Sequence, residues 1–252
     1  MSAMISAEPV LAPARTIRVA TWNVHSCVGG DGRHDPSRTA AVIAEIDPDI
    51  VALQEFRYPG DIALETRTPV VLTELDRYEC ALGPTLTRSG HCYGNVLLTR
   101  HPIRDVRRLD LSHARREPRG ALVATIDVDG LPIHVLATHL GLRLGERRLQ
   151  VRRILEFLDE LRSGFVVILG DFNDWLPGRS VVRVLAERLG ASPSPRTFPV
   201  AWPLFALDRI WVHPREALRS VTVHATPRAR AASDHLPVRA DLQAPVPGRL
   251  AP

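Results

Sequence analysis

The stretch that decides the fold is Val166-Val167-Ile168-Leu169-Gly170-Asp171-Phe172-Asn173. A short apolar run rich in β-branched residues predicts a buried strand, and polar residues begin directly where this run ends. Side chains two positions apart in an extended chain point to one side, so Asp171 and Asn173 should face the same way. A carboxylate and a carboxamide placed there could hold a metal ion, a water or a phosphate. Asp and Asn also begin ordinary turns, so the stretch alone leaves both interpretations open.

Composition predicts one globular domain of ordinary character. The 252 residues suffice for a substantial core, and the formal net charge of +4 is compatible with an anionic substrate but does not indicate a protein that coats nucleic acid. The cationic residues are all arginine, for which codon bias is the simplest explanation. An odd, scattered set of cysteines argues against both a disulfide framework and a thiolate zinc site. These cysteines are Cys27, Cys80 and Cys92.

The ends of the chain predict neither a secretory signal nor a membrane span. Residues 1–15 are rich in Ala, Pro and Ser and predict a disordered tail, and residues 243–252 predict a second flexible tail. Residues 16–242 contain no linker and predict a single domain. We therefore expect a cytoplasmic monomer without stable membrane insertion.

The order of the predicted elements indicates an α/β fold. The expected helices span residues 36–46, 68–76, 144–161 and 180–189. The expected strands span residues 16–24, 49–55, 78–82, 93–99, 103–109, 120–128, 133–138, 166–169, 207–213, 221–224 and 236–242. Residues 57–67, 85–91 and 191–207 are expected to form connections.

Several predicted strands begin or end in polar residues that packing does not require. If these strand ends share one edge, their side chains converge, as is usual in α/β active sites. Four carboxylates in one cleft would repel one another unless a divalent cation were present, and oxygen-rich ligands favour Mg²⁺, Mn²⁺ or Ca²⁺ over zinc. The converging set is Asn23, Glu55, His139, Asp171, Asn173, Asp208, Asp234 and His235.

Seven short motifs follow one another along the chain. They are Thr21-Trp22-Asn23-Val24, Leu53-Gln54-Glu55, Tyr93-Gly94-Asn95, Thr138-His139-Leu140, Gly170-Asp171-Phe172-Asn173, Leu207-Asp208-Arg209-Ile210 and Ser233-Asp234-His235-Leu236-Pro237. Taken in this order, the motifs resemble those of the endonuclease/exonuclease/phosphatase superfamily, which includes DNase I, exonuclease III-type repair nucleases, inositol polyphosphate 5-phosphatases and neutral sphingomyelinases. The resemblance covers roughly residues 16–242.

The resemblance implies a DNase I-like four-layer α/β/β/α sandwich of two mixed sheets, and hydrolysis of phosphate esters with Mg²⁺, for which Mn²⁺ can substitute. It implies that Glu55 is the main metal ligand, with Asn23 beside it and Asp234 as a further metal-side carboxylate.

The family's catalytic residues map onto the other motifs. Asp171 resembles the residue that positions the attacking water, and Asn173 resembles a phosphate contact. Asp208 and His235 resemble the family's Asp–His pair. His139 stands where DNase I-like members carry a second histidine. Repair-type members tend to have Tyr at that position, which argues against abasic-site repair.

These roles predict a simple mechanism. His235, near its ordinary pKa and oriented by Asp208, accepts the proton of a water. The metal and Asn173 stabilise the charge that develops on the phosphate oxygens, and so would His139 if it were protonated.

Other residues carry weaker hypotheses. Asn95 orients active-site groups or closes a turn, and Arg119 reaches a substrate phosphate or braces the sheet. Trp202 and Phe205 are expected to pack under a long loop. A set of helical arginines is expected to form a solvated face. This set is Arg143, Arg147, Arg148, Arg152 and Arg153.

The substrate stays open at this level. A low aromatic content of 5% and the absence of a compact basic–aromatic segment argue against a nuclease. The segment Thr138-His139-Leu140-Gly141-Leu142, followed by the predicted helix with Glu146-Arg147-Arg148-Leu149-Gln150, resembles the bacterial, sphingomyelinase-related branch of the family. That resemblance favours a lipid headgroup or a small phosphodiester, with DNA as the alternative. A non-catalytic binding module that kept the fold is a further alternative. Such a module would have lost Glu55, Asp171, Asp208 or His235, and all four are present.

Overall fold

Two β-sheets form the centre of the protein. The computed structural model describes residues 15–60, 75–161, 164–175 and 180–244. A six-stranded sheet has the order β10-β11-β1-β2-β4-β3, and a five-stranded sheet has the order β5-β6-β7-β8-β9. The strands of the first sheet are β1 (Thr16–Asn23), β2 (Ile50–Pro59), β3 (Glu79–Arg88), β4 (His91–Thr99), β10 (Leu218–Val223) and β11 (Val238–Gln243). The strands of the second are β5 (Ile103–Asp110), β6 (Gly120–Val128), β7 (Leu131–His139), β8 (Phe165–Asp171) and β9 (Asp208–His213).

Both sheets are mixed, because each contains one strand–helix–strand unit among antiparallel neighbours. Strand β1 runs parallel to β2, and β7 runs parallel to β8. The helices of these two crossovers are α1 (Pro36–Ile46) and α2 (Leu144–Glu160). In each unit the second strand ends at the same edge as the first, which brings polar residues from distant parts of the chain together.

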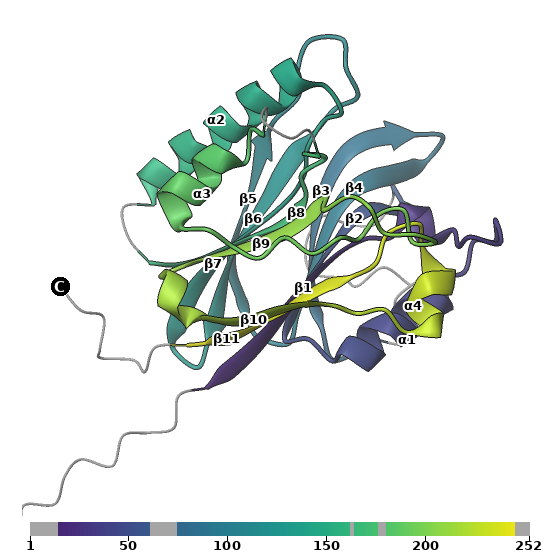
Figure 1. Ribbon diagram of the computed structural model, residues 1–252, viewed down its shortest axis with the longest axis horizontal. Helices are drawn as coiled ribbons and strands as arrows, with labels where there is room; N and C mark the ends of the chain where they lie inside the picture. Colours follow the sequence, from purple (N-terminus) through teal and green to yellow (C-terminus); the bar gives the residue numbers. More distant parts are fainter. Residues whose placement is uncertain (1–14, 61–74, 162–163, 176–179, 245–252) are drawn as a thin grey trace, which may run out of the picture.

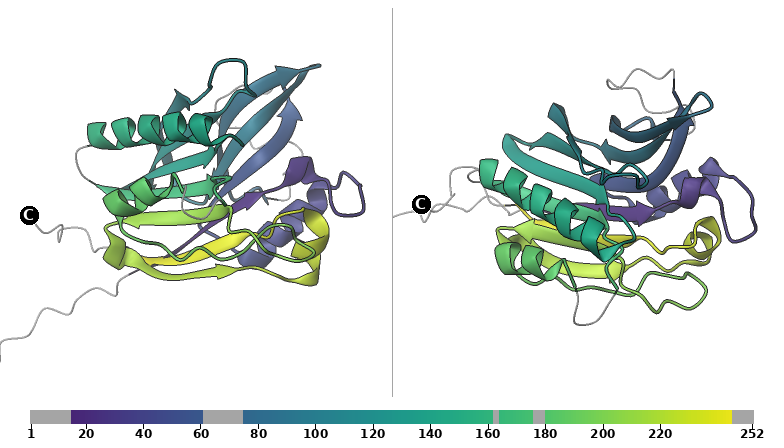
Figure 2. Two further views of the ribbon diagram at one scale, coloured as in Figure 1. Left: turned by 45° about the horizontal axis from the view of Figure 1, so that its top comes forward. Right: turned by 90° about the horizontal axis from the view of Figure 1, so that it is seen from above.

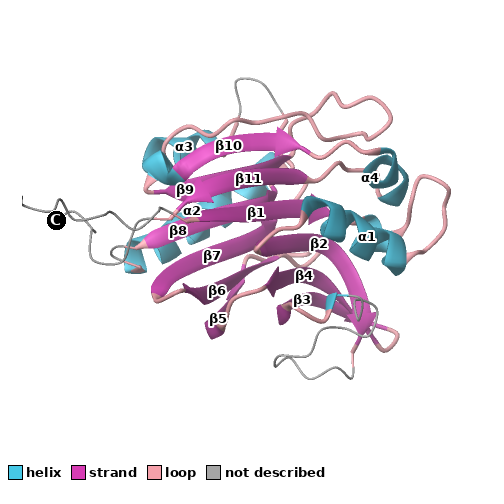
Figure 3. Cartoon of the chain, turned by 90° about the horizontal axis from the view of Figure 1, so that it is seen from below, coloured by secondary structure: helices cyan, strands magenta, loops and turns pink. Residues whose placement is uncertain are grey.

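The sheets pack face to face and are covered by helices on both outer sides (Figures 1 and 2). The core between the sheets contains alternate residues of both, such as Val19 and Ala52 of the first sheet and Val135 and Val167 of the second. A second core lies under α1 and the short α4 (Pro227–Ala232), which are side by side (Figure 3). The third core lies under α2 and α3 (Arg183–Leu189). The predicted four-layer sandwich is confirmed.

Some element boundaries differ from those predicted. Strand β3 continues to Arg88 and strand β4 begins at His91, so most of residues 85–91 is paired strand and not a connection. Pairing between β3 and β4 stabilises the extended conformation of these residues, although their turn-forming side chains predict a loop. Helix α4 was not predicted, because its six residues are too few for a periodic pattern. The short 3₁₀ helices η1 (His25–Cys27) and η3 (Arg215–Ala217) were not predicted either.

The second predicted tail begins too early. Gln243 is the last residue of β11 and pairs with Thr16, and the Ala244 N–H donates to the Arg15 carbonyl at 2.9 Å. The predicted helix at 68–76 and the predicted disorder of residues 1–14 and 245–252 fall almost entirely outside the described residues.

Two further expectations concern the whole chain. All three cysteines are buried and free, as their scattered positions predict. Within the described ranges, no helix is both long and apolar enough to cross a membrane.

Candidate active site

A row of polar side chains crosses one end of the second sheet. His139 is the register partner of Asp171 in β8, and Asp171 is the register partner of Asp208 in β9. Val167 and Leu169 pack into the core between the sheets, so strand alternation also turns Asp171 toward that inner space. The three side chains therefore lie next to one another at the rim between the two sheets.

The first sheet supplies Asn23 and Glu55 by two different devices. Asn23 follows Ile17 and Val19 at spacings of two and faces inward by alternation. Strict alternation would turn Glu55 outward, but the register between β2 and β4 shifts after Leu53. Glu55 has a φ of +57° at this bulge, and Asn173 has a φ of +48°. Positive φ at a residue other than glycine stores strain, and such strain concentrates at functional sites.

Gly170 explains why the signature stretch has glycine before Asp171. Its φ is +151°, and a Cβ at this position would lie 1.9 Å from the carbonyl oxygen of Thr138. The backbones of β7 and β8 approach too closely for any side chain there. This close approach sets His139 and Asp171 at the same height across the two strands.

Asp171 is the centre of the site. Its Oδ2 accepts a hydrogen bond from the Asn23 Nδ2 at 3.0 Å, and its Oδ1 accepts one from the Asn173 N–H at 2.9 Å. Burial disfavours the charged carboxylate, but the interactions with the imidazoles of His139 and His235 and these hydrogen bonds outweigh it and lower the pKa of Asp171. Asp171 is therefore ionised although only 1% of its surface is exposed.

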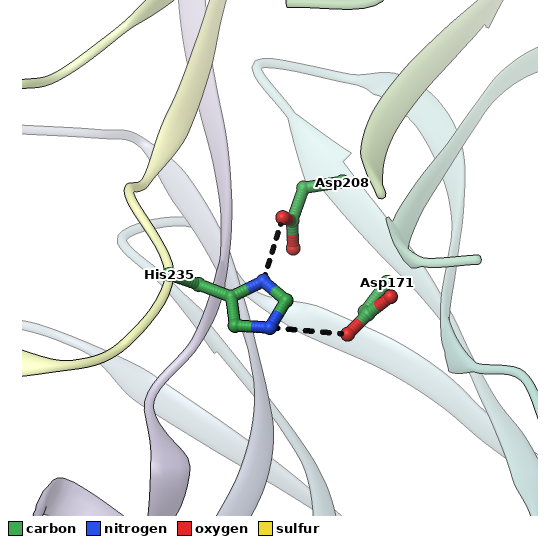
Figure 4. Close-up of side chains that lie close together, drawn as sticks. All are labelled: Asp171, Asp208 and His235. Carbon is green, nitrogen blue, oxygen red and sulfur yellow. Dashed lines mark hydrogen bonds and ion pairs between the residues drawn. The ribbon is translucent and has the colours of Figure 1, made fainter. Parts of the chain in front are cut away.

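His235 lies between two carboxylates (Figure 4). Its Nδ1 donates to Asp208 Oδ2 at 2.9 Å, and its Nε2 lies 3.8 Å from Asp171 Oδ2. Thr197 Oγ1 also donates to Asp208 Oδ2 at 2.5 Å. Burial alone lowers the pKa of His235, but the Asp208 charge and hydrogen bond, followed by the charges of Asp171 and Asp234, raise it to about 10. The expectation of an ordinary pKa for this histidine is wrong, and His235 carries a proton at neutral pH.

His139 has the opposite character. Its Nε2 lies 2.9 Å from Asn173 Nδ2, and its Nδ1 lies 3.4 Å from Arg119 Nη1. Burial is the main cause that lowers the pKa of His139, and the charge of Arg119 adds to it, while the charges of Asp171 and Glu55 oppose it. His139 is therefore neutral near pH 7, so the condition under which it would stabilise phosphate charge as a cation is not met.

The two carboxylates of Glu55 and Asp171 face each other across one amide group. Asn23 Nδ2 donates to Glu55 Oε1 at 2.9 Å as well as to Asp171, while Asn23 Oδ1 accepts from the His25 N–H. In this arrangement Asn23 holds the carboxylates by its NH₂ group, and its predicted role as a metal ligand stays a prediction. A hydrogen bond from Tyr93 also reaches Glu55, and burial and the Glu55 charge raise the pKa of Tyr93.

The donor set beside Glu55 fits a hard divalent cation. Its ligand atoms are carboxylate oxygens, which hard divalent cations prefer. Asn95 Oδ1 is a further oxygen nearby, and it is buried without a hydrogen-bond partner among the described residues. A second group with metal-binding potential, Asp171, Asp208 and His235, has ligand atoms within 4.8 Å of one another. Because Asp208 and His235 are already hydrogen bonded to each other, the Glu55 side offers the better-prepared position.

The weaker candidates also lie at this rim. Asn95 Nδ2 donates to the Gly120 carbonyl at 3.0 Å, and the Arg119 guanidinium lies 3.0 Å from Glu117. Asn95, Arg119, Glu55 and His139 line one small cavity of about 10 Å³. Their substrate-binding roles stay predictions that this arrangement supports.

Two predicted residues have other contacts in the structure. Asp234 is 42% exposed, and its carboxylate contacts Ser233 and lies 4.0 Å from His25 Nδ1. Asn173 Nδ2 donates to the Leu140 carbonyl at 2.9 Å in addition to facing His139. The metal-side role of Asp234 and the phosphate contact of Asn173 stay predictions.

The sequence analysis missed a buried pair behind the site. Arg147 of α2 is 1% exposed and donates to the carbonyls of Gly141 and Leu142, and its Nη2 lies 3.6 Å from Asp174 Oδ1. The expectation that Arg147 belongs to a solvated face is therefore wrong. This side chain joins the loop after His139 to the loop after Asn173. Glu146 and Gln150 are polar residues buried on the same side of the helix, and their spacing from Arg147 could have indicated a buried polar face there.

The prediction that Trp202 and Phe205 pack beneath a loop is also wrong. Trp202 is 74% exposed and Phe205 is 37% exposed. Phe198 takes the packing position instead, with its ring 4.7 Å from the ring of His235.

Comparisons with known proteins agree with this fold. The model of the endonuclease/exonuclease/phosphatase family matches residues 20–235. The uncharacterized protein YbhP of Escherichia coli K12 is 37% identical over 164 residues, which cover 61% of this chain and 63% of YbhP. The match thus spans somewhat less than two thirds of that relative.

Solved structures extend the similarity to nearly the whole chain. An endonuclease/exonuclease/phosphatase from Beutenbergia cavernae DSM 12333 superposes with a TM-score of 0.74 at 29% identity, covering 91% of this chain and 72% of that one. A mannosyl-6-phosphatase of Bacteroides thetaiotaomicron VPI-5482 superposes with a TM-score of 0.70 at 18% identity, covering 90% and 99%. The second likeness concerns the fold alone.

Proposed function

This chain belongs to the endonuclease/exonuclease/phosphatase family, and from that premise we propose that it is a divalent-metal-dependent phosphoric ester hydrolase in which His235 and Asp208 activate water. Members of the family are generally hydrolases of phosphate esters and usually use divalent metals. The proposed substrate is a lipid headgroup or another small phosphodiester.

The observation that carries the proposal is the convergence on Asp171 Oδ2. This one oxygen lies 3.0 Å from Asn23 Nδ2, 3.5 Å from His139 Nε2 and 3.8 Å from His235 Nε2. A water beside it can contact an ionised acceptor and an imidazole nitrogen together. Such a constellation serves proton transfer from water and has no evident use in packing.

The protein's own residues then divide the work. When bound, a divalent cation held by Glu55 would supply positive charge that stabilises the negative oxygens of the phosphate. In its neutral form, whose population grows as the pH rises toward the raised pKa, His235 accepts the proton of the attacking water through Nε2, because Asp208 keeps the other nitrogen protonated. Asp171 accepts a hydrogen bond from the same water and orients it.

The proposed reaction is hydrolysis by direct attack of water on phosphorus. The bond between the water oxygen and phosphorus forms, and the bond between phosphorus and the leaving oxygen breaks. The water's proton moves to His235 Nε2, and the leaving oxygen takes a proton from solvent. On the opposite side, Arg119 supplies positive charge and His139 supplies polar ring nitrogens near the negative phosphate oxygens.

The test uses bis(4-nitrophenyl) phosphate with Mg²⁺ or Mn²⁺. We expect release of 4-nitrophenolate that stops in EDTA and returns when excess metal is added. A parallel panel of sphingomyelin, phosphatidylinositol phosphates, plasmid DNA and abasic DNA identifies the substrate class. Failure to hydrolyse any member of the panel with either metal would refute the proposal and favour a non-catalytic binding module.

A further inference from the structure

Large apolar side chains gather on the surface beside the His235 half of the site. Among the described residues, those that are substantially exposed include Trp175, Leu204 and Phe205, with exposed fractions of 50%, 49% and 37%. The rings of Trp175 and Phe205 lie 5.5 Å apart and are inclined by 58°. Exposed aromatic groups that contact one another beside a polar site point to a ligand.

These side chains enclose a cavity of about 230 Å³. The described residues that line it are Asp174, Trp175, Ser180, Leu204, Phe205, Ala206 and Arg209. The Arg209 guanidinium donates to the Asp174 carbonyl at 3.2 Å and to Ser194 Oγ at 2.5 Å, which holds it in place. The cavity thus has aromatic and aliphatic walls together with one fixed cation.

Residues that line the cavity are neighbours of catalytic residues along the chain. Trp175 follows Asn173 by two positions, and Arg209 directly follows Asp208. Phe205 pairs with Phe198 through backbone hydrogen bonds in an antiparallel bridge, so both rings are on the same side. Because the Phe198 ring contacts the His235 ring, an aromatic row leads from His235 to Trp175.

The other half of the site has no such room. The cavity beside Glu55, Asn95, Arg119 and His139 has a volume of about 10 Å³, which is about that of one water probe. A substituent larger than a phosphate oxygen therefore finds space on the Trp175 side.

Resting on the proposed function, we infer that the Trp175–Phe205 cavity binds the non-leaving substituent of a phosphodiester, and that this substituent is an aromatic ring. In an in-line displacement the leaving oxygen departs opposite to the attacking water, which is beside His235. A group on the His235 side is therefore retained on the phosphate.

The walls favour a ring over a chain. A cavity of about 150 Å³ accommodates benzene, so the volume here suits a single ring and is small for a long acyl chain. The inclined faces of Trp175 and Phe205 offer edge and face contacts, and Arg209 offers a cation for the face of a bound ring.

The experiment uses three esters with one leaving group, namely phenyl, methyl and hexyl 4-nitrophenyl phosphate, with the full chain and Mn²⁺. We expect wild-type kcat/KM for the phenyl ester to exceed that for the methyl and hexyl esters by about tenfold, a typical aromatic contribution. Trp175→Ala and Phe205→Ala should each remove most of this preference by raising KM for the phenyl ester, whereas Trp175→Phe should retain it. Trp202→Ala is the matched control, since Trp202 is exposed but does not line the cavity.

The outcomes separate this inference from the proposed function. Turnover of all three esters at equal kcat/KM, or a hexyl ester as good as the phenyl ester, overturns the aromatic subsite and leaves the hydrolase intact. A preference that survives in both alanine variants also overturns the subsite. No turnover of any ester by the wild-type protein, with the wider substrate panel equally unreactive, overturns both.

Discussion

Two histidines flank Asp171, and their surroundings give them opposite protonation states. The His235 half of the site places Asp208 2.9 Å from Nδ1, and the pKa of His235 rises to about 10. The His139 half places Arg119 3.4 Å from Nδ1, and burial with this positive charge lowers the pKa of His139. Both rings are nearly fully buried, with exposed fractions of 5% and 6%.

Because both rings are buried, the residue that contacts Nδ1 distinguishes the roles of the two histidines. A carboxylate behind the ring prepares His235 to gain and pass on a proton, whereas burial, aided by the guanidinium behind the ring, keeps His139 neutral. One residue type thus supplies proton transfer on one side of the phosphate position and a polar, uncharged contact on the other. The predictions below test this division.

Removing His235 should have the largest effect. His235→Ala deletes the only proton acceptor assigned to the attacking water, and we expect kcat to fall by about a thousandfold. Because the variant also leaves Asp208 buried without its partner, kcat is measured at a temperature where circular dichroism shows that the variant is folded. His213→Ala, an exposed histidine at the far end of β9, is the matched control and should leave kcat unchanged. Turnover near the wild-type level in His235→Ala would remove the asymmetry on which the mechanism depends.

Removing the charge of Glu55 should have the next largest effect. Glu55→Gln keeps the shape and the contact with Asn23 but lacks the negative charge that a cation needs. We expect the Mg²⁺ concentration for half-maximal activity to rise by about a hundredfold. Titration of activity with metal measures this, and Glu117→Gln on the same rim is a control. An unchanged Mg²⁺ requirement would transfer the metal position to the Asp171, Asp208 and His235 group.

The raised pKa of His235 should appear as pH-dependent stability in EDTA. Because the folded pKa exceeds the ordinary value of about 6.5, the folded state binds more protons above that pH, and its stability falls as pH rises toward 10. Between pH 6.5 and 8.5 we expect a loss of about 2 kcal/mol in the free energy of unfolding. Urea titrations at each pH measure it.

Asp208→Asn is the control variant for this slope, since it removes the carboxylate that holds the proton. Burial raises the pKa of Cys27 to about 11 and that of Cys80 to about 12, so ionisation of these thiols in the unfolded state lowers stability from about pH 8.5 upward, at the end of the window, and does so equally in the wild type and in Asp208→Asn. A wild-type slope as shallow as that of Asp208→Asn would show that His235 is not protonated in the folded protein.

The sequence predicted the parts of this site that obey strand alternation. Asn23, His139, Asp171 and Asp208 all follow apolar residues of the inner core at spacings of two, or begin such a strand, so pattern and geometry agree. Glu55 was identified through its motif, because the bulge and the positive φ that turn it inward have no signature in the apolar pattern.

Contacts between distant segments account for what the sequence did not predict. Arg147 resembles its exposed neighbours on α2, and only the position of Asp174 shows that it is buried. The protonation states of both histidines likewise depend on Asp208 and Arg119, which are 27 and 20 residues away along the chain. Aromatic residues in a Pro-rich segment suggest packing, yet here the hairpin that contains Phe205 leaves it at the surface.

The smallest expected effect concerns the neutral histidine. Gln offers a carbonyl and an NH₂ group at a similar reach, so His139→Gln can keep polar contacts with Asn173 and Arg119 without any charge. We expect kcat/KM to fall by about tenfold, as for other supporting contacts, and its pH profile to keep its shape. His139→Leu, which leaves the Arg119 guanidinium without this partner, should lose more. Measurement of kcat/KM from pH 6 to 9 with the aryl ester decides between the roles. A loss in His139→Gln as large as that in His235→Ala, or a shifted pH profile, would mean that His139 works as a charged group, and the two halves of the site would then be alike.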